Sequence, residues 1–165
     1  GAFSRSIVDI EGAGQHYEWL RTRPQDYDRN VRVRLLTGLL TPAQAYFKAQ
    51  KLRSMLRQQV LSVLDRVDVL LTPATPEPPP KLMEGPGIKS REEADRLTRW
   101  VSPIAFTGPF NLASTPALVI PCGFTSDNLP ISMQIAGRPF DEETVLRVAY
   151  AYEQNTPWHL KRPPI

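Results

Sequence analysis

The stretch ALVIPCGFTSDNLPISMQIAG, residues 117–137, decides the fold of this chain. Its first part, residues 117–124, is a short apolar run, and residues 130–137 alternate between apolar and polar side chains. Both patterns indicate β-strands. The SDNLP segment between them, residues 126–130, has the composition of a turn. We therefore expect two strands joined by a turn.

The rest of the chain predicts one further strand and several helices. Residues 68–73, DVLLTP, form an apolar run that is ended by proline, which is typical of a buried strand. Helical patterns occupy residues 6–23, 26–38, 41–66, 90–101 and 140–154. Helices mixed with strands indicate an α/β fold. We expect a single domain over residues 1–165, with a proline-rich loop at residues 74–89.

Individual residues are expected to mark the ends of these helices. Gly38 is expected to stop one helix, and Thr41 to be the N-cap of the next. Asp141 is expected to cap the last helix, with Phe140 packed against Val145. Ser90 and Glu93 suit a capping box at the start of the helix at residues 90–101. The expected buried face of the long helix consists of Ala45, Ala49, Leu52, Leu56, Val60, Val63 and Val67.

Composition limits the class of protein. The chain has 165 residues, 41% of them hydrophobic and 22% charged, which is typical of a soluble globular protein. The net charge of +3 gives no reason to expect nucleic acid as a partner. No apolar run reaches the roughly 20 residues that span a membrane, so no membrane association is expected. A single cysteine favours a reducing compartment, and the cytoplasm is the expected location.

Residues with catalytic chemistry are few, and each has a structural alternative. Cys122 is the only cysteine, and neither His16 nor His159 is near it in the sequence, so we expect a packing role for it. Both histidines are interpreted as packed or surface residues, and no metal or cofactor site is expected. A basic region favours a solvated face over an acidic partner, and it consists of Arg21, Arg23, Arg29, Arg32 and Arg34.

Two later segments carry a specific resemblance. TGPFNLASTPALVIPCGF, residues 107–124, precedes LPISMQIAGRPFDEETVLRVAYAYEQNTPWH, residues 129–159. Together they resemble the C-terminal part of the amidase signature family, which pairs PFNL-x3-PA-x3-PCG with LP-x3-Q-x2-GRPFDE-x3-LR. The resemblance implies an α/β/α sandwich around a mixed sheet. It also implies that the chain is a C-terminal fragment of a longer amidase.

The chemistry implied by this resemblance is the cleavage of carbon–nitrogen amide bonds. In the family, a serine nucleophile is activated by a second serine, which follows a cis-peptide bond, and by a lysine. Those residues belong to the N-terminal half of the family, and no Gly/Ser-rich signature occurs here. We therefore assign no catalytic residue to this chain and expect it to be inactive alone. Its expected ligand in the whole enzyme is a small-molecule amide.

The resemblance also places part of the substrate pocket in this chain. In similar enzymes the residues just before the PFN motif approach the substrate, and here these are Ile104, Phe106 and Thr107, with Phe110 nearby. Packing is an equally good interpretation for each of them. Amidotransferase A subunits tend to carry an acid in this segment, where this chain has Ile104. An apolar pocket cannot compensate an ammonium ion, which argues against glutamine as substrate.

Three hypotheses therefore stand at this point. The first is a segment of an amidase with small or apolar amide substrates. The second is a segment of the A subunit of an aspartyl/glutamyl-tRNA amidotransferase, and the third is a non-catalytic α/β interaction module. Unpaired strand edges would favour association, so a homo-oligomer is expected.

Overall fold

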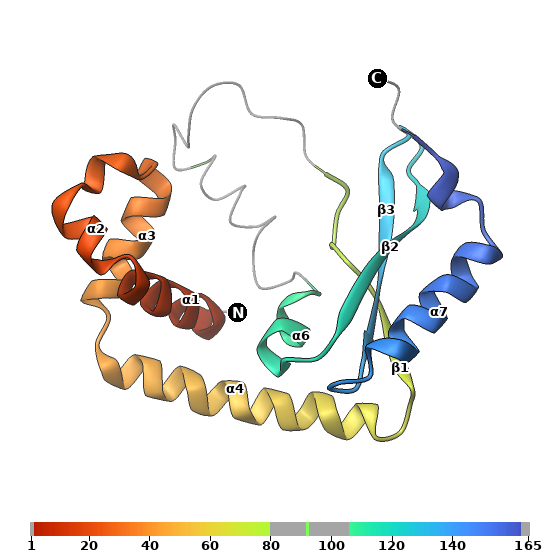
Figure 1. Cartoon of the computed structure of the whole chain (residues 1–165), viewed down its shortest axis with the longest axis horizontal. Coiled ribbons are helices and arrows are strands. Elements are labelled where there is room, and N and C mark those ends of the chain that lie inside the picture. Colours follow the sequence, from red (N-terminus) through yellow and green to blue (C-terminus); the bar gives the residue numbers. More distant parts are fainter. Residues whose placement is uncertain (1, 80–91, 93–105, 163–165) are drawn as a thin grey trace. The chain divides into compact units, whose positions relative to one another are not determined.

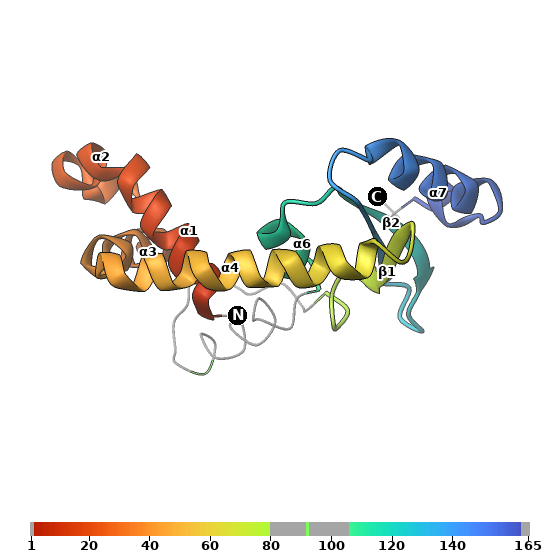
Figure 2. The same cartoon turned by 90° about the horizontal axis from the view of Figure 1, so that it is seen from below.

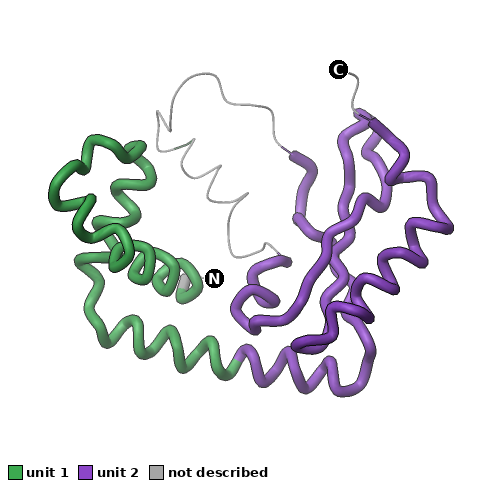
Figure 3. Tube along the Cα trace, viewed as in Figure 1, with its two compact units in different colours: residues 1–55, 82–103 green, residues 56–81, 104–165 purple. Residues whose placement is uncertain are grey.

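The structure is a computed structural model that describes residues 2–79, 92 and 106–162. The chain divides into two compact units (Figure 3), and each is described here by itself. The first comprises residues 1–55 and 82–103, and the second comprises residues 56–81 and 104–165. Apart from residue 92, the helix predicted at residues 90–101 lies outside the described residues, as does most of the proline-rich loop at residues 74–89.

The described part of the first unit is helical (Figure 1). Its elements are α1 (Ala2–Gln15), α2 (Tyr17–Thr22), the short 3₁₀ helix η1 (Pro24–Asp26), α3 (Arg29–Leu40) and the first part of α4 (Ala43–Leu64). The single helix predicted at residues 6–23 is thus two helices, because His16 forms a turn between α1 and α2. Asp28 is the N-cap of α3, and its carboxylate accepts a hydrogen bond from the backbone N–H of Asn30.

Gly38 lies inside α3 and does not end it, so that prediction was wrong. A Cβ atom at Gly38 would lie 2.0 Å from the backbone oxygen of Asp9 and 3.0 Å from Cβ of Ala13, both on α1. The glycine therefore allows the two helices to approach closely, and the helix ends only at Leu40. Thr41 is the C-cap of α3, and its hydroxyl donates a hydrogen bond to the backbone oxygen of Thr37.

The expected buried face of α4 is only partly correct. Ala49 is 2% exposed, whereas Leu52 and Val67 are 38% and 40% exposed. Leu64, which lies outside the predicted face, is 1% exposed. The predicted face was derived from apolar residues at three-and-four spacing, which holds only if the same side of the helix is buried along its whole length. The two ends of α4 pack in different units, so no single face is buried along its length.

The basic region uses most of its arginines in local contacts. The guanidinium of Arg34 donates two hydrogen bonds, of 3.0 and 2.6 Å, to Oδ1 of Asp9, which is 8% exposed. Arg21 pairs with Glu18 at 3.0 Å. Arg23 lies over the Trp19 ring, and Arg32 donates to a backbone oxygen in η1. These contacts support the interpretation as a solvated face with internal pairing.

The second unit contains a three-stranded antiparallel sheet (Figure 1). The strands are β1 (Val69–Pro73), β2 (Ala117–Phe124) and β3 (Pro130–Gly137), in the order β1-β3-β2. The helices are the end of α4, α6 (Gly108–Ala113) and α7 (Glu142–Gln154), followed by the 3₁₀ helix η2 (Trp158–Leu160). The α/β class and the three predicted strands are confirmed, with antiparallel pairing throughout the described strands.

The predicted turn between β2 and β3 is confirmed. Thr125 closes it, because its N–H donates to the backbone oxygen of Leu129 and its hydroxyl accepts from the N–H of Leu129. Asn128 has φ of 60°, a conformation that asparagine tolerates. Cys122 lies at a register shift between Pro121 and Gly123, which is typical of a β-bulge, and it is half-buried.

One face of the sheet packs against α7 (Figure 2). Ile120 and Ile135 from the sheet form a core with Val145 and Ala149 from α7. The helix comes so close to β3 that a Cβ atom at Gly137 would lie 2.6 Å from Cγ2 of Val145.

The start of α7 confirms one prediction and contradicts another. Asp141 is its N-cap, as predicted, and accepts a hydrogen bond from the N–H of Thr144. The expected packing of Phe140 against Val145 was wrong: Phe140 is 95% exposed, and its φ of 64° turns the chain at this point.

Candidate functional site

The segment that precedes α6 contains most of the predicted pocket residues. Phe106 is 37% exposed and lies in a turn, and Thr107 is the half-buried N-cap of α6. The Thr107 side chain makes no capping hydrogen bond, although its backbone oxygen accepts from the N–H of Asn111 at 3.2 Å. The hydroxyl of Thr107 therefore does not cap α6.

The other two predicted pocket residues are Phe110 and Ile104. Phe110 is only 6% exposed and belongs to the interior of the second unit, which favours its packing interpretation. Ile104 lies outside the described residues. The structure therefore brings Phe106 and Thr107 together at the start of α6, with Phe110 one turn further on and turned inward.

The far end of α6 is anchored by a cation. Ser114 is the C-cap and has φ of 53° and ψ of 54°, a left-handed conformation that ends the helix. Arg57, in the part of α4 that belongs to the second unit, donates hydrogen bonds to the backbone oxygens of Ala113 and Ser114. A guanidinium suits this position, because the carbonyls at a helix C-terminus carry partial negative charge.

The start of α6 is anchored by a buried amide that sequence reasoning did not single out. Gln134 lies on β3 and is 2% exposed. Its Nε2 donates to Oγ1 of Thr72 at 3.0 Å and to the backbone oxygen of Phe106 at 3.2 Å. The signal in the sequence was a glutamine in the middle of an otherwise buried strand segment, where a polar side chain requires partners.

Arg138 makes a second connection that sequence reasoning missed. It follows β3 and donates hydrogen bonds to the backbone oxygens of Leu64, at 3.1 Å, and Val67, at 2.9 Å. It also lies 3.6 Å from Asp68 and 3.9 Å from the N-cap Asp141. Arg138 therefore ties the turn between α4 and β1 to the start of α7.

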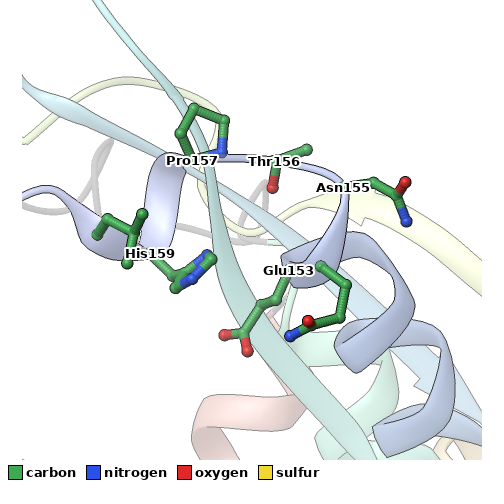
Figure 4. A pocket seen from close by; sticks show the side chains of 7 residues that line it. Glu153, Asn155, Thr156, Pro157 and His159 are labelled. Carbon is green, nitrogen blue, oxygen red and sulfur yellow. The ribbon is translucent and has the colours of Figure 1, made fainter.

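A shallow hollow with a volume of about 440 Å³ lies at the C-terminal end of α7 (Figure 4). Its lining consists of Glu153, Gln154, Asn155, Thr156, Pro157, His159 and Leu160. The side chains of Asn155 and Thr156 donate to the backbone oxygens of Ala151 and Tyr152, so they complete the end of the helix. Nδ1 of His159 is buried and has no hydrogen-bond partner in the described structure.

The remaining candidates show no catalytic arrangement. His16 contacts the hydroxyl of Tyr27 at 2.9 Å through Nδ1, which supports its interpretation as a packed residue. Within residues 2–79, 92 and 106–162, no group of three His, Cys, Asp or Glu side chains could hold a metal ion. In the same residues, no helix is both long enough and apolar enough to cross a membrane.

Comparison with known proteins identifies the class. The sequence profile of the family described as Amidase matches residues 4–146, which is most of the chain, so the chain belongs to this family. It is 41% identical over 158 residues to the A subunit of the glutamyl-tRNA(Gln) amidotransferase of Methanosarcina mazei, a match that covers 93% of this chain and 31% of the relative. The chain thus spans about a third of the length of this relative.

Similar solved structures include an amidase and an amidotransferase A subunit. A crystal structure of an amidase has 28% sequence identity and a TM-score of 0.75, and the match covers 92% of this chain and 34% of that one. The A subunit of the glutamyl-tRNA(Gln) amidotransferase of Thermotoga maritima has 32% identity and a TM-score of 0.57, with the same two coverages. The predicted resemblance to the amidase signature family is therefore confirmed, and the fold is that of its members.

Proposed function

We propose that this chain supplies part of the substrate-pocket wall of an amide hydrolase. The observation that carries this proposal is the family match over residues 4–146, which includes the segment that starts α6. The wall would consist of Phe106 and Thr107, with Ile104 before them and Phe110 behind them. Phe106 offers an aromatic surface. The hydroxyl of Thr107 makes no capping hydrogen bond, so it can donate a hydrogen bond to the carbonyl of an amide substrate or accept one from its N–H.

In the proposed reaction the wall binds the substrate. The nucleophile is supplied by residues outside this chain. The family's serine, activated through a second serine and a lysine, attacks the amide carbonyl, and the amine or ammonia leaves as the acyl-enzyme forms. Water then releases the acid. An apolar wall on the acyl side would exclude water and orient the carbonyl towards the serine.

The experiment uses the complete protein encoded by the reading frame that contains this chain, with the chain alone as a matched sample. We expect the complete protein to release ammonia from simple aliphatic amides, and the chain alone to release none. Absence of ammonia from every amide tested would overturn the proposal. Hydrolysis by the isolated chain would show instead that the nucleophile lies within residues 1–165.

The second candidate is transfer of amide nitrogen to a tRNA-bound glutamate, which is favoured by the name of the relative that is 41% identical. Simple amides remain the first candidate because Ser102, Pro103, Ile104 and Ala105 carry no charge that could bind the ammonium group of glutamine. Activity with glutamine but not with simple amides would reverse this order. The substitution Ile104→Asp should shift the preference towards glutamine, and an unchanged substrate profile would remove Ile104 from the wall.

A further inference from the structure

Gln134 is a buried polar side chain in the sheet of the second unit. It lies on the central strand β3, on the face of the sheet opposite to the core formed with α7, and only 2% of it is exposed. Burial of an amide is unfavourable unless hydrogen bonds replace those it makes with water. The partners of its amide therefore indicate the role of Gln134.

The amide donates to two different parts of the second unit. Thr72 stands directly opposite Gln134 in the pairing of β1 with β3, and its Oγ1 accepts at 3.0 Å. The second acceptor is the backbone oxygen of Phe106, at 3.2 Å. Since Nε2 has two hydrogens, these two bonds use its full donor capacity.

The Phe106 carbonyl belongs to the peptide group that leads into Thr107. The position of this carbonyl therefore fixes the peptide plane from which Thr107 and the first turn of α6 start. The other end of α6 is held by Arg57 through the backbone oxygens of Ala113 and Ser114. The segment between residues 106 and 114 is thus fixed at both ends, once by a neutral amide and once by a cation.

We propose that Gln134 is a positioning residue for substrate binding, which acts by holding the Phe106 carbonyl and so setting the pocket wall. This inference rests on the proposed function. Gln134 does not itself touch the substrate, because it is buried beneath the segment that it holds. Thr72 orients the amide, because its hydroxyl accepts one of the two Nε2 hydrogens and leaves the other for Phe106.

The test compares four variants of the complete protein with the wild type. Q134L keeps the approximate size of the side chain and removes both donors. Q134E keeps the shape but replaces the donor with an acceptor that faces the Phe106 carbonyl. T72V removes the hydroxyl that orients the amide. The matched control is V145A, which creates a cavity on α7, on the opposite face of the sheet, and leaves the bonds of Gln134 intact.

Steady-state kinetics on a simple amide give the first readout. We expect Q134L and Q134E to raise KM by about fivefold or more, the loss expected from one hydrogen bond, with a smaller change in kcat. We expect a smaller rise for T72V and an unchanged KM for V145A, even where its melting temperature falls as far as that of Q134L. An unchanged KM in Q134L, or an equal rise in V145A, would overturn the inference.

Hydrogen exchange gives a readout that does not depend on activity. Peptides covering residues 106–113 should exchange faster in Q134L and Q134E than in V145A at matched stability. If the wild type hydrolyses no amide, the proposed function fails while this measurement still decides whether Gln134 holds the segment. Equal exchange of this segment in Q134L and the wild type would overturn the positioning role even in an active enzyme.

Discussion

The crossing of α1 and α3 at Gly38 gives a prediction in which helix propensity and packing act in opposite directions. Alanine is the better helix former by about 1 kcal/mol, so Gly38→Ala should stabilise α3 if only local preference counted. The new Cβ atom would instead lie 2.0 Å from the backbone oxygen of Asp9, where real Cβ atoms do not come closer than 3.0 Å. The helices would therefore have to separate by at least 1.0 Å, the difference between these two distances.

The cost of that separation follows from what lies at the crossing. Ala13 and Leu35 are buried where α1 meets α3, and a gap of 0.5–1 Å forfeits about a quarter to a half of a van der Waals contact energy. Overpacking of this kind costs about 1–3 kcal/mol, and the bond between Arg34 and the buried Asp9 would be strained in addition. We expect a net loss of about 2 kcal/mol in the free energy of unfolding.

The matched control is Gly14→Ala on α1. A Cβ atom at Gly14 would have no neighbour within 4 Å, so only helix propensity changes, and we expect a gain of about 0.5–1 kcal/mol. Urea unfolding followed by circular dichroism gives the overall stability, and hydrogen exchange of α1 and α3 locates the change in the first unit. Equal stabilisation by both substitutions would refute the account of the crossing.

Three further predictions concern the second unit. Gly137→Ala should lower the free energy of unfolding by about 1–3 kcal/mol through overpacking against Val145. The control Gly108→Ala has no neighbour within 4 Å of the new Cβ atom and should cost less than half of that. Adding Val145→Ala to Gly137→Ala should restore part of the lost stability, and strictly additive effects of the two substitutions would contradict the contact between them. Arg138→Met should lower the free energy of unfolding by about 1–3 kcal/mol, because it removes the donor that Arg138 offers to the backbone oxygens of Leu64 and Val67. An unchanged urea midpoint would contradict this role of Arg138. The outer strands of the described sheet, β1 and β2, should promote self-association of the chain, and a single monomeric boundary in sedimentation velocity at high concentration would argue against it.

The sequence predicted the strands well because local signals agree there. Strand β1 was predicted from an apolar run that ends at a proline, β2 from an apolar run, and the link between β2 and β3 from its turn composition. No neighbouring segment gives a signal that contradicts these. The N-cap Asp141 was predicted for the same reason, since the cap and its partner are only three residues apart.

The errors have other causes. Gly38 has the local signature of a helix end, but it is needed where another helix passes, and the sequence of α3 does not show that crossing. Phe140 was expected to pack locally, but its positive φ directs the chain away from α7. The candidate site was located from a family resemblance, whereas its supports, Gln134 and Arg57, act on carbonyls 28 and more residues away. Such contacts depend on tertiary structure and leave only a weak trace in the sequence.

The central claim is that the start of α6 forms the acyl-side wall of an amide-binding pocket. The most direct measurement is kcat/KM for a series of straight-chain aliphatic amides, with the complete wild-type protein and its Phe106→Ala variant. Removal of the exposed ring should favour longer acyl chains, and each methylene that fills the vacated space should gain up to about fourfold in kcat/KM, the equivalent of about 0.8 kcal/mol. The same chain-length profile in both proteins would contradict the claim.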